Sequence, residues 1–193
     1  KTKELLVDFR RCKTNPPPLV IKGEEVERVS SFRYLGVQLS ERLDWSDNIL
    51  STYKKCTSKL YFVRKLKSFN VSDKILQLFY EALVQSTLSF CITCWGGNMT
   101  SQGRKRLTRV IKTASKISGH SFPSLDDLYE IAIRRKSTAI LNDTSHPLHE
   151  YYAIAHSGHR YLSIQARTNR LRDSFVPTSI RAINNEMGRK RQK

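Results

Sequence analysis

Several residue patterns on which enzymes commonly depend are missing from this sequence of 193 residues. It has no Gly-rich phosphate loop, no Gly-x-Ser-x-Gly motif and no adjacent aspartate pair in a strand-turn context, which excludes three common kinds of catalytic or nucleotide-binding site. It also has no His-x-Asp pair, which excludes the iron site that such a pair would build. We therefore expect no catalytic residue, no metal site, no cofactor and no small-molecule substrate.

Cysteine is too sparse for a disulfide scaffold, since only Cys12, Cys56, Cys91 and Cys94 occur. No charged and apolar leader with a small-residue cleavage site is present, which argues against secretion. Because the first residue is Lys1 and a strand-like run follows at once, we expect the chain to open in the middle of a longer protein. We predict an intracellular protein, nuclear or cytoplasmic; the terminal basic run Arg189–Lys193 hints at the nucleus.

Two groups of metal-binding residue types are better explained by structure. Cys91 and Cys94 have the spacing of half a zinc site or a redox pair, but they close a predicted helix, and the nearest histidine, His120, stands alone. We interpret them as buried structural cysteines. Proline and glycine interrupt two histidine pairs spaced by three, so we interpret these as loop histidines: His146, His149, His156 and His159. The Asp126-Asp127 pair follows Pro123-Ser124 at a predicted helix start, where acids favour the helix dipole, so we interpret it as capping.

Acidic residues are few in this chain, and they are almost absent from one region. The whole chain has 34 lysines and arginines against 17 acids, but between Leu50 and Gly119 the only acids are Asp73 and Glu81. This excess of positive charge favours binding to a polyanion. Nucleic acid is the best candidate, because neutralising its phosphates releases bound counterions. The alternative is a solvated, solubilising helix surface. The basic residues of this region are Lys54, Lys55, Lys59, Arg64, Lys65, Lys67, Lys74, Arg104, Lys105, Arg106, Arg109, Lys112 and Lys116.

The hydrophobic periodicity predicts an α+β fold that is mainly α: a small N-terminal antiparallel β-element, a helical bundle and an irregular basic tail. Alternating patterns predict strands over Glu4 to Phe9 and Tyr34 to Leu39, with a hairpin turning at Lys22-Gly23. Spacings of three and four predict helices from Trp45 onward, after Ser72, over Arg104 to Ser118 and from about Ser124 to Leu141. Beyond Asn142 we expect short ordered pieces at best.

The segment Ile75 to Trp95 is about as long as a spanning helix. Gln77, Glu81 and Gln85 lie in its middle, and one central carboxylate would cost about 2.5 to 3.5 kcal/mol in a bilayer. We therefore predict a core helix that begins after Ser72 and no membrane association. The expected core contacts are Leu76, Phe79, Tyr80, Leu83 and Leu88.

Several longer stretches resemble the reverse transcriptase of non-LTR (LINE-type) retrotransposons, downstream of its catalytic aspartates. They are residues 1–11, 26–37, 43–45, 60–66, 145–147, 167–170 and 173–177. The resemblance implies four parts: 1–42, the end of the palm and a primer-grip-like β-element; 43–97, thumb-like helices; 98–142, a C-terminal helical region; and 143–193, a basic, partly disordered tail. It implies a primer grip at Phe32, Arg33, Tyr34, Leu35 and Gly36.

The paired aspartates of that polymerase family would lie upstream of Lys1, so we expect this chain to bind nucleic acid without catalysis of its own. The expected partners are RNA, DNA or an RNA–DNA hybrid. The residues predicted to bind it are Lys54, Lys55, Lys59, Arg64, Lys65, Arg104, Lys105, Arg109 and Lys112.

Two other hypotheses stay open. The sequence around Phe32 to Trp45 is also similar to the N-terminal accessory region of AlkB-type dioxygenases, whose name is tied to tRNA modification, although the missing His-x-Asp pair argues against dioxygenase activity. The third hypothesis is a protein-interaction module on which the basic charge is incidental.

Overall fold

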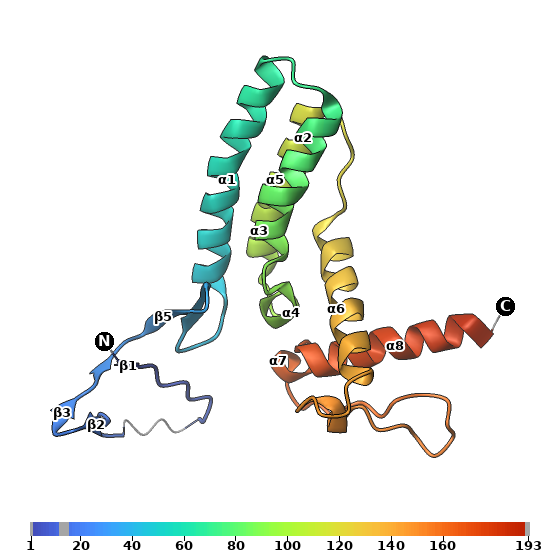
Figure 1. Ribbon diagram of the computed structural model, residues 1–193. Coiled ribbons are helices and arrows are strands. Elements are labelled where there is room, and N and C mark those ends of the chain that lie inside the picture. Colours follow the sequence, from blue (N-terminus) through green and yellow to red (C-terminus); the bar gives the residue numbers. More distant parts are fainter. Residues whose placement is uncertain (1, 12–15, 192–193) are drawn as a thin grey trace.

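The computed structural model describes residues 2–11 and 16–191 (Figure 1). The fold is α+β and mainly α, as the periodicity predicts. A long helix, α1 (Ser46–Ser68), stands beside a second helical run, with α5 (Ser101–Ser118) packed along both and α6 (Leu125–Leu141) following. The strands lie at the foot of α1, and a C-terminal helix crosses the far end of α6. Lys1, Cys12 and the last two residues of the terminal basic run fall outside the described residues.

Short two-stranded ladders make up the N-terminal β-region. β2 (Val20–Ile21) and β3 (Glu24–Glu25) form the hairpin expected at Lys22-Gly23, and both turn residues have positive φ. β1 (Lys3–Glu4) pairs in parallel with β4 (Glu27–Arg28), so the prediction of a purely antiparallel element is wrong for this pair. The predicted strand to Phe9 pairs only over Lys3–Glu4. Beyond that pair Val7 and Phe9 are exposed, and within the described ranges they belong to no strand.

The run from Tyr34 to Leu39 is a hairpin, not the single strand that its alternation predicts. β5 (Ser31–Tyr34) pairs antiparallel with β6 (Val37–Ser40), with Tyr34 opposite Val37. The two residues between them, Leu35 and Gly36, have φ of 45° and 89°. Positive φ at both central positions defines a type I′ turn, whose twist matches that of the flanking strands. The hairpin places Gly36 and Arg33 against the start of the helical region.

The predicted core helix after Ser72 is a composite of three segments. α2 (Asp73–Phe79) passes directly into a π-helical segment, η1 (Tyr80–Gln85), and then into α3 (Ser86–Ser89). The chain breaks at Phe90, whose ψ is 118°, and Cys91 with φ of 50° starts the single turn α4 (Ile92–Trp95). Single π-turns inside α-helices often occur at functional sites. Cys91 therefore begins a helical turn instead of closing one.

One face of this composite helix lies in the core. Leu76, Tyr80, Val84 and Leu88 are fully buried, whereas Ile75, Leu78 and Leu83 are exposed. The predicted core contact at Leu83 is wrong because the wider π-turn shifts the register of the buried face. By length and composition alone, Asp73–Trp95 is also apolar enough to cross a membrane. Helices that pack inside a protein pass the same test of length and composition.

Helices α5 and α6 begin at residues that satisfy their first backbone N–H groups. Thr100 accepts a hydrogen bond from the Gly103 N–H at the start of α5. At α6, Ser124 Oγ accepts from the Asp127 N–H at 3.1 Å and Asp127 Oδ2 accepts from the Ser124 N–H at 2.9 Å, which is a reciprocal capping box. The capping interpretation of the aspartate pair is confirmed for Asp127.

Two separate cores hold the helices together. The larger lies between α1, the composite helix, α4, α5 and the first half of α6, with Trp95 and Leu107 fully buried. Tyr80 stacks on Phe122, with ring centroids 3.7 Å apart. The smaller core joins Ile140 at the end of α6 to Ile180 and Tyr152. Helix α6 therefore contributes to both cores and links them.

The C-terminal region is more regular than the prediction of an irregular tail. After the short helices η2 (His149–Tyr151) and α7 (Asn169–Arg172), α8 runs from Phe175 to Arg191. Pro177 falls in its first turn, where the missing N–H is tolerated. The preceding loop is fixed to α8, because the Tyr161 N–H donates to Asn184 Oδ1 at 2.8 Å and the Tyr152 hydroxyl lies 2.7 Å from Ser179 Oγ.

Candidate nucleic-acid interface

Helix α1 distributes its predicted basic residues over three directions. Lys55 and Lys59 face the composite helix, where they line a groove with residues of α3 and the β5–β6 hairpin. Arg64 turns to the other side, lining a small hollow of about 100 Å³ with Arg109 of α5. Lys54 and Lys65 are exposed and line neither depression. The structure therefore does not unite the α1 residues in one face.

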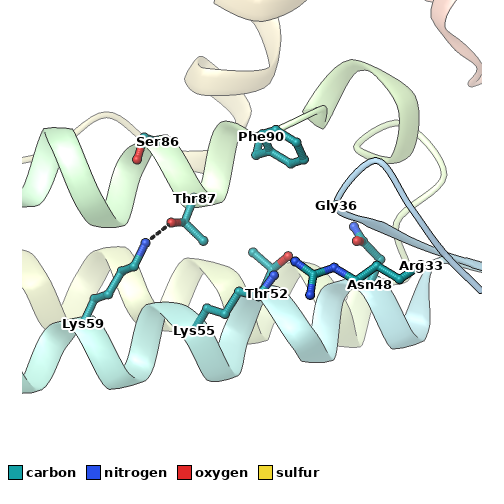
Figure 2. A pocket seen from close by; sticks show the side chains of 9 residues that line it. All are labelled: Arg33, Gly36, Asn48, Thr52, Lys55, Lys59, Ser86, Thr87 and Phe90. Atoms are coloured by element: carbon teal, nitrogen blue, oxygen red, sulfur yellow. Dashed lines mark hydrogen bonds between the residues drawn. The ribbon is translucent and has the colours of Figure 1, made fainter.

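The first surface is the α1–α3 groove, a depression of about 380 Å³ between α1 and α3 (Figure 2). Arg33 and Gly36 enter it from the hairpin, and Lys55 and Lys59 from α1. Of the five residues predicted as a primer grip, only these two hairpin residues line the groove; the hairpin residues Phe32, Tyr34 and Leu35 are exposed. The remaining lining residues are Asn48, Thr52, Ser86, Thr87 and Phe90.

Lys59 is held at one end of this groove by neutral acceptors. Its Nζ donates to the Leu83 carbonyl at 3.0 Å and to Thr87 Oγ1 at 2.5 Å. The preceding turn of α1 contributes Cys56, whose Sγ lies 3.8 Å from the Val84 carbonyl. Both carbonyls belong to the π-helical segment, so α1 side chains satisfy oxygens at the place where the helical ladder is irregular. Burial raises the pKa of the Cys56 thiol to about 11, against the opposing effect of Lys59 and Lys55.

The second surface is on α5, and it is a continuous line of positive charge. Lys105, Arg109, Lys112 and Lys116 are exposed and lie at spacings of four, three and four, which places them on one helix face; we call them the α5 stripe. Within residues 2–11 and 16–191, none of the four is within ion-pair distance of a carboxylate. Helix α5 contains no acidic residue at all. The stripe borders a shallow hollow of about 410 Å³.

Arg104 differs from the other predicted α5 residues because it is paired. Its guanidinium forms an ion pair with Asp126, in the first turn of α6. The pair joins the starts of two neighbouring helices, so Arg104 also has a structural partner. Although Arg104 borders the same hollow as three of the stripe residues, its charge is partly neutralised.

Sequence reasoning missed several residues that the structure brings to these surfaces. Lys116 extends the α5 stripe by one turn, and its spacing from Lys112 was a usable signal. Phe90, Thr87 and Ser86 line the groove opposite Lys55 although they are more than thirty positions away in the chain. No local sequence pattern predicts that these residues lie near Lys55, because their proximity depends on how α1 packs against the composite helix.

The cysteines and histidines weighed as metal ligands are not gathered into a metal site in the described residues. Across the described ranges, no group of three or more His, Cys, Asp or Glu side chains is placed to hold a metal ion. Cys91 is half-buried, and burial raises the pKa of its thiol. Cys94 is exposed, so the prediction that both cysteines are buried is wrong for it. His149 has a structural contact, with Nδ1 3.0 Å from the Ile140 carbonyl.

Comparison with known proteins gives one family match, over part of the chain. Residues 45–86 match the family model described as "Alkylated DNA repair protein alkB homolog 8, N-terminal". The matched segment contains α1, α2 and η1, and so includes the groove wall that carries Lys55 and Lys59 together with the π-turn. No curated protein and no solved structure matches the chain.

The family match corrects the sequence interpretation. The identification with a reverse transcriptase of non-LTR retrotransposons is wrong, and with it the primer grip, the thumb and the polymerase parent. The match supports the AlkB-type alternative instead, although it begins at Trp45, where the similarity noted in the sequence ended. The overturned identification rested on similar stretches between residues 1 and 177, and the comparisons give no reverse transcriptase among their matches.

Proposed function

We propose that this chain is a nucleic-acid-binding accessory domain of the AlkB homologue 8 N-terminal type, with no catalysis of its own. The matching family is named for the repair of alkylated DNA, and residues 45–86 carry the match. That name supports a nucleic-acid partner, RNA or DNA. The net charge of +17 supports the same class of partner, because a positive field of this size attracts polyanions.

The observation that carries the proposal is the α5 stripe. Its four cations are exposed, aligned on one face and without a carboxylate neighbour in the described part of the chain. Like charges three or four positions apart on a helix destabilise it by about 0.2–0.5 kcal/mol per pair. A charge pattern that works against its own helix is best explained by a ligand that neutralises it.

The experiment is a fluorescence-anisotropy titration of the whole chain against labelled single-stranded RNA, single-stranded DNA, duplex DNA and RNA–DNA hybrid over a salt series. Binding should weaken linearly on a log–log plot, by about 0.9 per phosphate contact on duplex and about 0.7 on single strands. Folded protein that binds none of these nucleic acids at low salt would refute the proposal.

A matched variant separates the stripe from net charge. The stripe variant carries Lys105→Gln, Arg109→Gln, Lys112→Gln and Lys116→Gln. The control variant removes four other exposed charges, with Lys22→Gln, Lys74→Gln, Arg135→Gln and Lys136→Gln. Both variants have the same net charge. We expect the stripe variant to lose most of the binding and the control variant to keep most of it.

A second candidate function is protein docking, which one observation favours. Phe69, Ile75 and Leu78 lie close together in the chain and are 75%, 53% and 65% exposed. Exposed large apolar side chains grouped in this way are typical of interaction surfaces. Protein partners bound there would be retained at high salt, whereas nucleic acid on the α5 stripe would be released.

A further inference from the structure

The α1–α3 groove has the size and the walls of a small-ligand site. Its volume of about 380 Å³ falls within the range of ligand pockets, roughly 300–1,000 Å³. Helix α1 forms one wall, α3 with Phe90 forms the other, and the β5–β6 hairpin closes one end, as Figure 2 shows. It is separate from the α5 stripe, whose residues do not line it.

The charge of the groove selects an anion. Three cationic side chains line it, and no carboxylate of the described residues does. Lys59 is anchored on neutral oxygens, so its charge is not cancelled. Arg33 and Lys55 are exposed, and neither has a carboxylate within ion-pair distance in the part of the chain that the structure describes. Two such cations close together hold a phosphate well, the guanidinium by its planar fork and the ammonium as a point charge.

The floor of the groove supplies neutral donors. Asn48 and Thr52 are both buried on the groove side of α1. The Gln38 backbone N–H donates to Asn48 Oδ1 at 3.1 Å, which fixes the amide and turns its NH₂ group away from that bond. The Thr87 hydroxyl on the opposite wall is not such a donor, because its O–H donates to the Leu83 carbonyl at 2.7 Å and its oxygen accepts from Lys59. The groove therefore offers hydrogen bonds as well as charge to whatever occupies it.

Phe90 adds an apolar plate at the rim. Its side chain is 51% exposed, although it borders the groove, and it sits where the backbone leaves α3. The edge of the ring is close to the hairpin, since a Cβ built on Gly36 would be 3.1 Å from Phe90 Cε1. The ring therefore lies close to the hairpin turn while part of its surface stays open. Aromatic side chains in this situation stack bases of single-stranded nucleic acid.

We propose that the α1–α3 groove binds one nucleotide of a single strand, with its phosphate between Arg33 and Lys55 and its base stacked on Phe90. The inference rests on the proposed function and locates a single-strand site that is distinct from the α5 stripe. A phosphate site alone would not need the exposed ring, and a purely apolar site would not need three cations. The two features together specify a nucleotide.

The test uses the full chain and a labelled oligodeoxyuridine, compared with an abasic strand of the same length. Lys55→Gln should weaken binding at low salt and lower the salt slope by about 0.7, because one phosphate contact is lost. Lys74→Gln is the matched control, because it removes the same charge from an exposed position outside the groove and the α5 stripe. It should bind almost as the wild type does.

Phe90→Leu tests the base contact. Loss of stacking should weaken binding to oligodeoxyuridine about fivefold or more and leave the salt slope unchanged. On the abasic strand the same substitution should have no effect. Circular dichroism and thermal unfolding check that each variant is folded. If Phe90→Leu does not fold, Lys55→Gln still tests the proposal, because it changes an exposed side chain.

The outcomes distinguish the two proposals. If Lys55→Gln and Lys74→Gln weaken binding equally, or Phe90→Leu acts equally on both strands, the groove proposal is overturned while the function carried by the α5 stripe stands. Inorganic phosphate that displaces the strand as well as uridine monophosphate does would also overturn it, because the groove would then recognise phosphate alone. If the wild-type chain binds no nucleic acid, both proposals fall.

Discussion

Helix α5 has two faces that differ in almost every respect. The inner face carries Leu107, Val110 and Ala114, which are buried in the larger core. The outer face carries the α5 stripe, with four cations and no nearby carboxylate in the described part of the chain. The inner face removes apolar surface from water, whereas the outer face accumulates repulsion. The inner face therefore accounts for the stability of the helix. The positive charge of the outer face is explained only by a partner outside the folded chain.

The largest expected effect comes from breaking the inner face. Leu107 is fully buried between α5 and its neighbours, so Leu107→Ala leaves a cavity and should lower the free energy of unfolding by about 2–5 kcal/mol. Thr108→Ala, one position further along, changes a half-buried side chain and is the control. Urea unfolding followed by circular dichroism measures both. Equal, small losses for the two variants would contradict the assignment of the core.

Buried and exposed cysteines should differ in thiol reactivity, as the two faces of α5 differ in their surroundings. Cys56 on α1 is fully buried with its pKa raised to about 11, whereas Cys94 on α4 is exposed. Relative to a thiol with the ordinary pKa of 9.0, the thiolate fraction of Cys56 near neutral pH should be lower by roughly 100-fold. In a Cys12→Ser background, alkylation followed by peptide mass mapping should therefore modify Cys94 first and Cys56 only in denaturant. Early labelling of Cys56 in folded protein would show that the core is open there.

A smaller effect is expected at the start of α6, which contrasts with α5 because it has acids in its first turn. Ser124→Ala removes one half of the capping box and should lower the free energy of unfolding by about 1 kcal/mol. Hydrogen bonds from Ser124 lower the pKa of Asp127 below its ordinary value. Because the folded-state pKa is depressed, this stabilisation is present above about pH 4 and is lost as the pH falls through the lowered value. The difference between wild type and Ser124→Ala should narrow in acid.

The smallest effect on stability should come from the outer face of α5. Lys112→Gln removes repulsion from Arg109 and Lys116, so the free energy of unfolding should stay constant or rise by a few tenths of a kcal/mol. Thermal unfolding at low salt, where the repulsion is least screened, is the appropriate measurement. A clear loss of stability would mean that the stripe has a structural role that the observed contacts do not show.

Most of the helices could be predicted from the sequence, because their spacing of apolar residues is a local pattern. Spacings of three and four predicted α1, α5 and α6, and the Ser124 and Asp127 pattern predicted the start of α6. The turn at Leu35-Gly36 was missed because leucine rarely adopts positive φ, so the alternation looked like an uninterrupted strand. Helix α8 was missed because Pro177 and Gly188 weaken its pattern and much of its support comes from contacts with a distant loop.

The candidate interfaces were only partly predictable for the same reason. The α5 stripe lies on one helix, so its spacing was visible in the sequence, including at Lys116, which the predicted binding residues left out. The groove requires Phe90 and Thr87 to meet Lys55 across two packed helices, and a π-turn sets their register. Such a meeting is a product of tertiary packing. The AlkB-type alternative, which the match over residues 45–86 supports, rested on sequence similarity and not on basic, helical character, which many unrelated proteins share.

The central claim, that the outer face of α5 is a nucleic-acid surface, is tested most directly by the salt dependence of binding. Anisotropy titrations of the wild type, the stripe variant and the charge-matched control against one single-stranded RNA would give three log–log slopes. We expect the stripe variant to have the shallowest slope, reduced by about 0.7 for each of its cations that contacts phosphate, and the control to match the wild type more closely. Equal slopes for the stripe variant and the control would show that only net charge matters, and would contradict the account.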